Sequence, residues 1–179
     1  MRSMQDVTII PFAEQKPQIA ASAFIASGAR IIGNVTLGDN TNIWFNTVIR
    51  GDVHFIRIGV DTNIQDNSTI HVTTKTHPTI IGNKVTVGHQ AVVHGCQIDD
   101  LCLIGMGAIV LDGVKVGEKS IVGAGSLLPP GKTYPPACLI VGSPAKVKRE
   151  LSPEEIAFLT LSADHYVKTS HSYDVHCQV

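Results

Sequence analysis

The hydrophobic positions of this 179-residue chain recur every six residues. Between residues 98 and 128 the period is unbroken, and its members are Ile98, Ile104, Val110, Val116, Val122 and Leu128. A small or β-branched side chain comes four residues after several of them: Cys102, Ala108, Val114, Ser120 and Ser126. Six is neither the period of an α-helix nor the alternation of strands joined by hairpins. The pattern predicts a solenoid in which each unit is one short strand and one turn.

The same frame occurs earlier in three shorter runs. Their members are Leu37, Ile43 and Ile49; Ile58, Ile64 and Ile70; and Ile81, Val87 and Val93. Three units of six residues close one triangular coil, and parallel coils then cover each other's apolar edges. A glycine directly after the aliphatic position, as at Gly105, Gly117 and Gly123, permits close packing that a larger side chain would resist. We therefore predict a mainly β fold, a parallel β-helix of hexapeptide repeats over residues 1–150.

The frame slips at three places. The interval is nine residues from Ile49 to Ile58, eleven from Ile70 to Ile81 and five from Val93 to Ile98. Insertions in a solenoid emerge as loops on its surface, often on the binding face. The polar segment 72–79 (VTTKTHPT), in the second interval, is predicted to be such a loop.

A different period follows residue 151. Ser152, Pro153 and Glu155 have the spacing of a helix N-cap, a first helical residue and a capping-box glutamate. Apolar residues then recur at three- and four-residue spacings, namely Ile156, Leu159, Ala163, Tyr166 and Val167. The segment 151–179 is therefore predicted to hold an α-helix from about 153 to 169 and a frayed tail over 170–179. Such a helix must pack along the outside of the β-helix, either its own or a neighbour's.

Composition narrows the class of partner and the compartment. The 14 basic and 15 acidic side chains nearly cancel, which argues against nucleic acid or an anionic membrane as the partner. No apolar run is long enough to span a bilayer and no signal peptide is recognisable, so a cytoplasmic location is expected. Cys96, Cys102 and Cys138 form no CxxC pair and are interpreted as small buried apolar residues, whereas Cys177 is assigned no role.

Three of the eight histidines stand out by position. His71 directly follows Ile70 and His94 directly follows Val93, in a slot where repeats usually carry a small residue. His89 lies 18 residues, nominally one coil, after His71, although the insertion between them leaves their stacking open. Catalytic zinc sites use three protein ligands and keep one position open for water, which three histidines would fit. Alternatively, these side chains merely line a contact between subunits.

Arg50 and Gln65 occupy the same slot after an aliphatic residue. Arg50 is followed two residues later by Asp52, and Gln65 is followed directly by Asp66. Read simply, Arg50 and the aspartates would pair across an exposed surface, and such ion pairs contribute only about 0–1 kcal/mol.

Together, these motifs resemble the γ-class carbonic anhydrases and their close relatives. The similar segments are IRGDV at residues 49–53, NIQDNSTIHV at 63–72, VTVGHQAVVHGC at 85–96, LIGMGAIVLDGVKVG at 103–117 and VGSPAKVKREL at 141–151. The resemblance extends from about residue 10 to about residue 168, and His71 together with GHxxxxHGC is its most specific part. It implies that the β-helix is left-handed and that the chain forms a homotrimer.

The resemblance also implies roles for single residues. His71 and His94 would bind a metal ion together with His89 of a neighbouring chain, the ion being Zn²⁺, with Co²⁺ or Fe²⁺ as other possibilities. Gln65 would lie near the metal-bound solvent, and Tyr166 of the terminal helix would reach toward the site. Arg50, Asp52 and Asp66 match charged residues that lie between subunits in the family. Arg50 is also expected to be a catalytic residue.

The implied activity is that of a lyase, the hydration of carbon dioxide to bicarbonate by metal hydroxide chemistry. A proton must then leave the site, and the prototype carries acidic residues in two loops for this purpose. In this chain Val53 and His54 stand in the first loop, and the uncharged-to-basic segment 72–79 stands in the second. Because the acidic residues are missing from both loops, we expect slow turnover. His54 or His77 would be the available relays, since histidine titrates near neutral pH.

Three other functions remain open from the sequence. A hexapeptide acyltransferase would use the same fold, coenzyme A and a catalytic histidine. An acyl-CoA thioesterase would use the same metal chemistry on a different small-molecule substrate. A trimeric scaffold would carry a purely structural metal, and a saturated ligand sphere would distinguish it from an enzyme.

Overall fold

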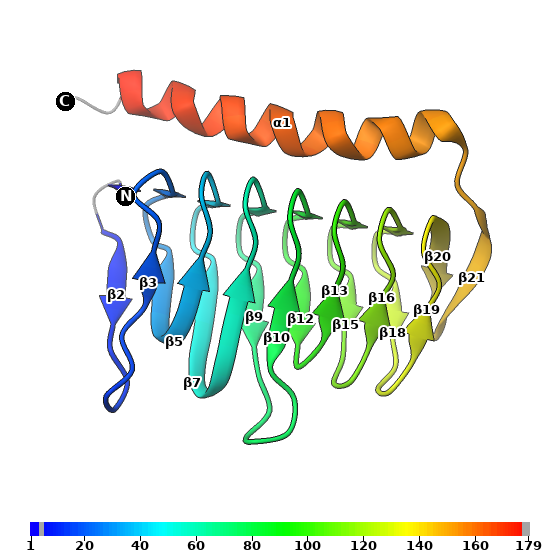
Figure 1. Ribbon diagram of the computed structural model, residues 1–179, viewed down its shortest axis with the longest axis horizontal. Coiled ribbons are helices and arrows are strands. Elements are labelled where there is room, and N and C mark those ends of the chain that lie inside the picture. The colour runs from blue at the N-terminus through cyan, green and yellow to red at the C-terminus, as the bar shows by residue number, and fades with distance from the viewer. Residues whose placement is uncertain (4–5, 177–179) are drawn as a thin grey trace.

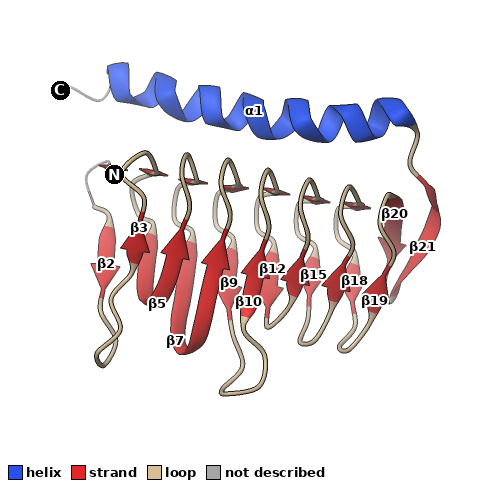
Figure 2. Ribbon diagram, viewed as in Figure 1, coloured by secondary structure: helices blue, strands red, loops and turns tan. Residues whose placement is uncertain are grey.

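The computed structural model describes residues 1–3 and 6–176 of the chain. It is a parallel β-solenoid of about seven turns with one long helix lying beside it (Figures 1 and 2). The mainly β fold predicted from the six-residue period is thereby confirmed. Within the described residues no helix is long and apolar enough to cross a membrane.

Three rows of strands form the sides of the solenoid. The first row, which ends in the antiparallel strand β21, contains β1 (Arg2–Ser3), β4 (Phe24–Ile25), β6 (Asn42–Ile43), β8 (Asn63–Ile64), β11 (Thr86–Val87), β14 (Leu103–Ile104), β17 (Ile121–Val122), β20 (Cys138–Gly142) and β21 (Ala145–Glu150). The second row contains β2 (Thr8–Ile10), β5 (Arg30–Leu37), β7 (Val48–Ile58), β9 (Thr69–His71), β12 (Val92–His94), β15 (Ile109–Val110) and β18 (Leu127–Leu128). The third row contains β3 (Gln18–Ile19), β10 (Thr79–Ile81), β13 (Gln97–Ile98), β16 (Lys115–Val116) and β19 (Thr133–Tyr134), and it is joined to the second by the long strands β5 and β7.

The aliphatic residues of the six-residue series form the core. All six members between Ile98 and Leu128 are fully buried, and the earlier runs are at most 3% exposed. Neighbouring coils keep these residues in register, as where Ile104 pairs with both Val87 and Val122. The coils approach closely at the glycine slot, since a Cβ on Gly105 would lie 2.4 Å from the amide nitrogen of Ala124. The glycine after the aliphatic residue is therefore required by packing between coils.

The three slips in the frame have three different structural outcomes. The eleven-residue interval projects as a loop whose ends meet in a bridge between Thr73 and His77, as predicted. The nine-residue interval was expected to be a loop and is instead the interior of β7, which pairs with β5 across a register shift between Gly33 and Val35. The prediction was wrong there because the extra residues are taken up at this register shift: Gly33 pairs with Gly51 and Val35 with Ile56, so β7 holds three more residues than β5 between the two pairs and then resumes pairing. The five-residue interval is a tightened corner at Gly95, whose φ is +57°.

The terminal helix α1 runs from Pro153 to His176 along the first row of strands (Figure 1). Its capping box is present: the Glu155 amide donates to Ser152 Oγ at 3.3 Å, and the Ser152 amide donates to Glu155 Oε2 at 2.9 Å. Leu159 and Ala163 are buried against the solenoid of the same chain. The predicted helix start at residue 153 is thereby confirmed.

The helix does not end near residue 169. Tyr173 lies with its ring centroid 5.4 Å from that of Trp44 and 6.0 Å from that of Phe24. This aromatic cluster stabilises the last turns, so the predicted frayed tail is wrong for residues 170–176. Residues 177–179 of that tail, including Cys177, lie outside the described part of the chain.

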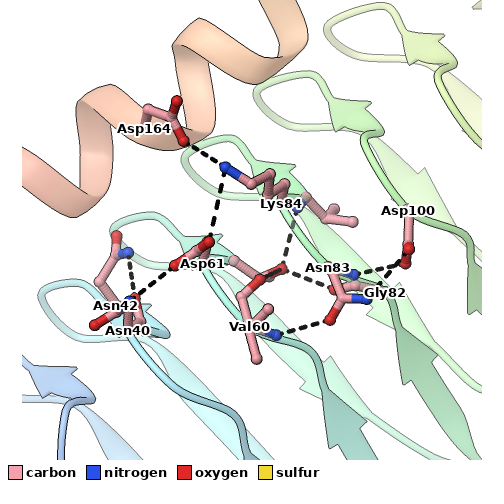
Figure 3. Close-up of polar contacts among 11 residues, drawn as sticks. Asn40, Asn42, Val60, Asp61, Gly82, Asn83, Lys84, Asp100 and Asp164 are labelled. Atoms are coloured by element: carbon pink, nitrogen blue, oxygen red, sulfur yellow. Dashed lines mark hydrogen bonds and ion pairs between the residues drawn. The ribbon is translucent and has the colours of Figure 1, made fainter.

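An ion pair joins the helix to the solenoid, next to polar contacts between successive coils (Figure 3). Lys84 Nζ lies 2.6 Å from Asp164 Oδ1 on α1 and 3.7 Å from Asp61 Oδ2 on the preceding coil. Both hydrogen bonding and the charge of Asp164 raise the pKa of Lys84. Half-exposed ion pairs of this kind contribute only about 0–1 kcal/mol, so they set the position of the helix more than its stability.

The buried cysteines are free thiols, as the sequence predicted. Cys96, Cys102 and Cys138 are each at most 3% exposed. Burial raises the pKa of Cys102 to about 12, so it stays protonated at neutral pH. These residues serve as core side chains.

Replacing Tyr173 with alanine should detach the last turns of α1 and expose Trp44, the chain's single tryptophan. We expect a red shift of tryptophan emission and a loss of roughly 1–3 kcal/mol in unfolding free energy. Lys168→Ala, at an exposed position of the same helix, is the matched control and should change neither. Unchanged emission in Tyr173→Ala would contradict this packing.

Candidate metal centre

Two histidines stack on adjacent coils at the end of the second row of strands. His71 ends β9 and His94 ends β12, and the two residues are register partners in that parallel pair. His71 Nδ1 lies 3.0 Å from His94 Nε2, and the ring planes are tilted by 60°. The solenoid brings them together because the loop after His71 projects outward and leaves the coil spacing unchanged.

Each of these rings has a carboxylate at its other nitrogen. Asp52 Oδ1 lies 3.1 Å from His71 Nε2, and the same carboxylate accepts a hydrogen bond from Arg50. Asp112 Oδ1 lies 2.5 Å from His94 Nδ1. Within the described part of the chain, His71 Nδ1 and His94 Nε2, the two nitrogens that face each other, therefore have no carboxylate partner.

The local electrostatics favour neutral imidazole and ionised carboxylate. Burial is the largest effect on His71 and lowers its pKa despite the hydrogen bond to Asp52. Burial would raise the pKa of Asp112, but the hydrogen bonds that its carboxylate accepts from Thr73 and His94 outweigh burial, and the pKa is lowered. The pKa of Asp52 is lowered in the same way by His71 and Arg50. A neutral imidazole is the form that binds metal ions.

His89 lies at another corner of the solenoid, before β12 begins. Its Nδ1 lies 2.6 Å from Asp66 Oδ2 on the preceding coil, and its side chain is 42% exposed. The neighbouring Gln65 is buried and donates from Nε2 to Asn63 Oδ1 at 3.1 Å. His89 therefore repeats the histidine–carboxylate pairing, separated from the other two by the length of one strand.

A groove of about 590 Å³ runs from this corner between α1 and the solenoid. Gln65, His89 and Tyr166 line it together with the apolar side chains Leu103, Ile104, Met106, Ile121, Val122, Phe158 and Leu161. The Tyr166 ring packs edge-on against Trp44 with centroids 5.7 Å apart. Burial, and then the charge of Asp66, raise the pKa of Tyr166, which keeps its hydroxyl protonated at neutral pH.

The residues singled out in the sequence thus fall into two groups. Arg50, Asp52, His71 and His94 form one, and Gln65, Asp66, His89 and Tyr166 form the other. Among the residues that the structure describes, no three or more His, Cys, Asp or Glu side chains are arranged to hold one metal ion within a single chain.

Sequence reasoning missed Asp112 and Thr73. Asp112 follows His94 by 18 residues, which is one coil, and this spacing is the signal that would have found it. Thr73 Oγ1 donates to Asp112 Oδ2 at 2.6 Å across 39 residues of sequence, a contact that no local pattern indicates.

Comparisons with known proteins agree with this architecture. The family described as "Bacterial transferase hexapeptide (six repeats)" matches residues 16–51. A hexapeptide transferase family protein from Anaplasma phagocytophilum superposes with a TM-score of 0.90 at 42% identity, covering 95% of this chain and 99% of that one.

Several relatives in sequence are named as carbonic anhydrases. One from Geobacillus kaustophilus is 49% identical over 165 residues, covering 92% of this chain and 90% of the relative. γ Carbonic anhydrase 1, mitochondrial, of Arabidopsis thaliana is 42% identical over 171 residues, and the match spans 62% of its length. The chain thus spans about three fifths of that longer plant relative. Similarity at this level, over nearly the whole chain, means that the chain belongs to the γ-class carbonic anhydrase family of hexapeptide-repeat proteins.

Proposed function

We propose that this chain is a metal-dependent lyase that hydrates carbon dioxide to bicarbonate. One observation carries the proposal: each of the three candidate ligands, His71, His89 and His94, has a carboxylate on one ring nitrogen. Metal-binding histidines in proteins almost always bond their other ring nitrogen to a carboxylate, a backbone carbonyl or water, which fixes the tautomer and the ring orientation. Three such pairs beside an apolar groove are more than a general base alone requires.

The geometry of the histidine pair fits a tetrahedral metal ion. Ligand nitrogens about 2.05 Å from zinc in a tetrahedral site lie about 3.3 Å from each other. The 3.0 Å between His71 Nδ1 and His94 Nε2 is within a few tenths of an ångström of that value. Bound there, zinc, cobalt or iron would act as a Lewis acid that lowers the pKa of a water ligand to about 7.

The third ligand is proposed to come from a second copy of the chain. His89 and His94 stand at opposite ends of one face of the solenoid, so one chain supplies two ligands at one corner and one at the other. A head-to-tail contact between different surfaces closes into a ring when its rotation is right, and a C3 trimer would contain three equivalent sites. Arg50, Asp52 and Asp66 lie beside these ligands, which supports their proposed place at the contact between subunits.

The remaining polar residues would orient the reactants. The Nε2 of Gln65 is engaged by Asn63, so its carbonyl oxygen is the group left to accept a hydrogen bond near His89. Tyr166 would act as a hydrogen-bond donor and not as a base, because its raised pKa keeps it protonated. Arg50 would hold Asp52 ionised and aimed at His71.

Proton transfer out of the site is proposed to be slow. The interval after Ile49 carries His54 and the interval after Ile70 carries His77, at the two places where the prototype of the family has acidic residues. The His54 Nδ1 accepts a hydrogen bond from the Phe55 amide at 2.9 Å, which leaves one nitrogen for proton exchange. The cytoplasmic location and the absence of a nucleic-acid or membrane partner stay predictions.

The wild-type protein should bind about one zinc per chain and hydrate carbon dioxide, and His89→Ala should lose both. His171→Ala, an exposed histidine on α1, is the matched control and should keep both. Metal content by mass spectrometry and stopped-flow hydration give the two measurements. Bound metal without hydration would contradict this substrate and favour a structural metal in a scaffold, whereas a metal-free wild type would contradict the site itself.

A second candidate function, transfer or hydrolysis of an acyl group, is favoured by the groove between α1 and the solenoid. Carbon dioxide needs no apolar groove of about 590 Å³, a volume typical of sites for larger small molecules. The wall contributed by Leu103, Ile121 and Phe158 would hold an aliphatic chain with its carbonyl end near His89 and Tyr166. The acyl carrier in this case would be a coenzyme A thioester.

Filling the groove separates the two activities. Leu103→Trp should block an acyl chain and abolish hydrolysis of a medium-chain acyl-CoA, if that is the activity, while leaving carbon dioxide hydration within about twofold of wild type. Lys115→Trp, on the third row of strands, controls for the added bulk. A wild type without thioester hydrolysis would remove this candidate.

A further inference from the structure

The loop that follows His71 is bonded at its far end to both histidine-bearing strands. The buried Thr79 hydroxyl donates to the carbonyl oxygen of His71 and accepts a hydrogen bond from the Gly95 amide at 2.9 Å. Gly95 is the residue after His94. The end of the loop is therefore held against the backbone of both candidate ligands.

The near end of the loop reaches the partner of His94. Thr73 Oγ1 donates to Asp112 Oδ2 at 2.6 Å, while Asp112 Oδ1 lies 2.5 Å from His94 Nδ1. Both oxygens of this carboxylate are thus engaged, one by the loop and one by the histidine. A carboxylate fixed at both oxygens cannot rotate away from the imidazole without breaking a strong hydrogen bond.

The position of Thr73 is itself fixed by the loop. Its amide donates to the His77 carbonyl at 3.0 Å, and the His77 amide donates back to the Thr73 carbonyl at 3.4 Å. The Lys75 amide donates to the Val53 carbonyl on β7 at 3.4 Å. The hydroxyl is consequently presented from a closed turn anchored to a long strand.

The corner after His94 leaves room for this arrangement. A Cβ on Gly95 would lie 2.3 Å from Asp112 Oδ1 and 2.9 Å from the Cβ of His77. Any larger residue would therefore push Asp112 away from His94 or displace the loop. Gly95, at the corner of the shortened interval, therefore allows the loop, the Asp112 carboxylate and His94 to meet.

We propose that Thr73 is a positioning residue for the metal centre, acting through Asp112 to hold His94 with its Nε2 directed at the ion. This role rests on the proposed metal site. In that site, the eleven-residue interval between Ile70 and Ile81 supplies the Thr73 hydroxyl, for which a regular six-residue unit has no place.

The test is zinc affinity, measured by competition with a chromophoric chelator, in three variants of the full-length protein. Thr73→Val removes only the hydroxyl and should weaken binding roughly threefold to tenfold, less than the 10- to 100-fold typical of a group that contacts a ligand directly. Thr73→Ser restores the hydroxyl and should bind as wild type. Thr74→Val, the same change at the exposed neighbouring position, should leave affinity unchanged.

A double-mutant cycle separates positioning from a merely structural role. Asp112→Asn should weaken binding about 10- to 100-fold, and adding Thr73→Val should weaken it little further, because both changes act on one path to His94. The visible spectrum of the cobalt-substituted protein should change in Thr73→Val and not in Thr74→Val. The melting temperature of each metal-free variant monitors the fold.

Fully independent effects of Thr73→Val and Asp112→Asn would overturn the proposal, as would wild-type affinity in Thr73→Val. A wild-type protein that binds no zinc contradicts the proposed metal site and this role together. Normal zinc binding by the wild type that is insensitive to Thr73→Val contradicts the role of Thr73 alone.

Discussion

The register between parallel coils is the constraint on which the rest of this structure depends. Each aliphatic residue of the six-residue series lies directly against its counterpart one coil away, and the buried stack so formed leaves little room for slippage. Because the register is fixed, every side chain next to the stack is fixed as well. His94 stands over His71, and Asp112 on the next coil reaches His94, for this reason alone.

That register also explains how much could be predicted from the sequence. Ile98 and its successors repeat without interruption, so the core, the parallel coils and the glycine slot followed from spacing. The start of α1 followed from the capping residues Ser152 and Glu155. The helix end did not, because Tyr173 is held by Phe24 and Trp44 from coils more than 120 residues away in sequence. Contacts of that range leave no trace in a local period.

The residues of the candidate site also divide into those that the sequence predicted and those that it did not. His71 and His94 stand out because each occupies a position where the repeat usually carries a small residue, and His89 stands out because it lies 18 residues after His71. Their carboxylate partners could be found only in part: Asp52 and Asp66 stand beside other marked residues, whereas Asp112 sits in a loop-like DG pair typical of an ordinary turn. The prediction that the interval after Ile49 is a loop failed because the extra residues are absorbed at a register shift against β5, and pairing between coils is a tertiary property.

The central claim is that one active site is assembled from two copies of the chain, and subunit mixing tests it most directly. A His89→Ala chain keeps His71 and His94, and a His94→Ala chain keeps His89, so neither trimer alone has an intact site. In a randomly assembled equal mixture, about one site in four joins an intact pair to an intact His89. The account predicts that co-expression restores zinc to about a quarter of the wild-type content, with each variant alone near zero. Mixed trimers that bind no more zinc than the separate variants would contradict it.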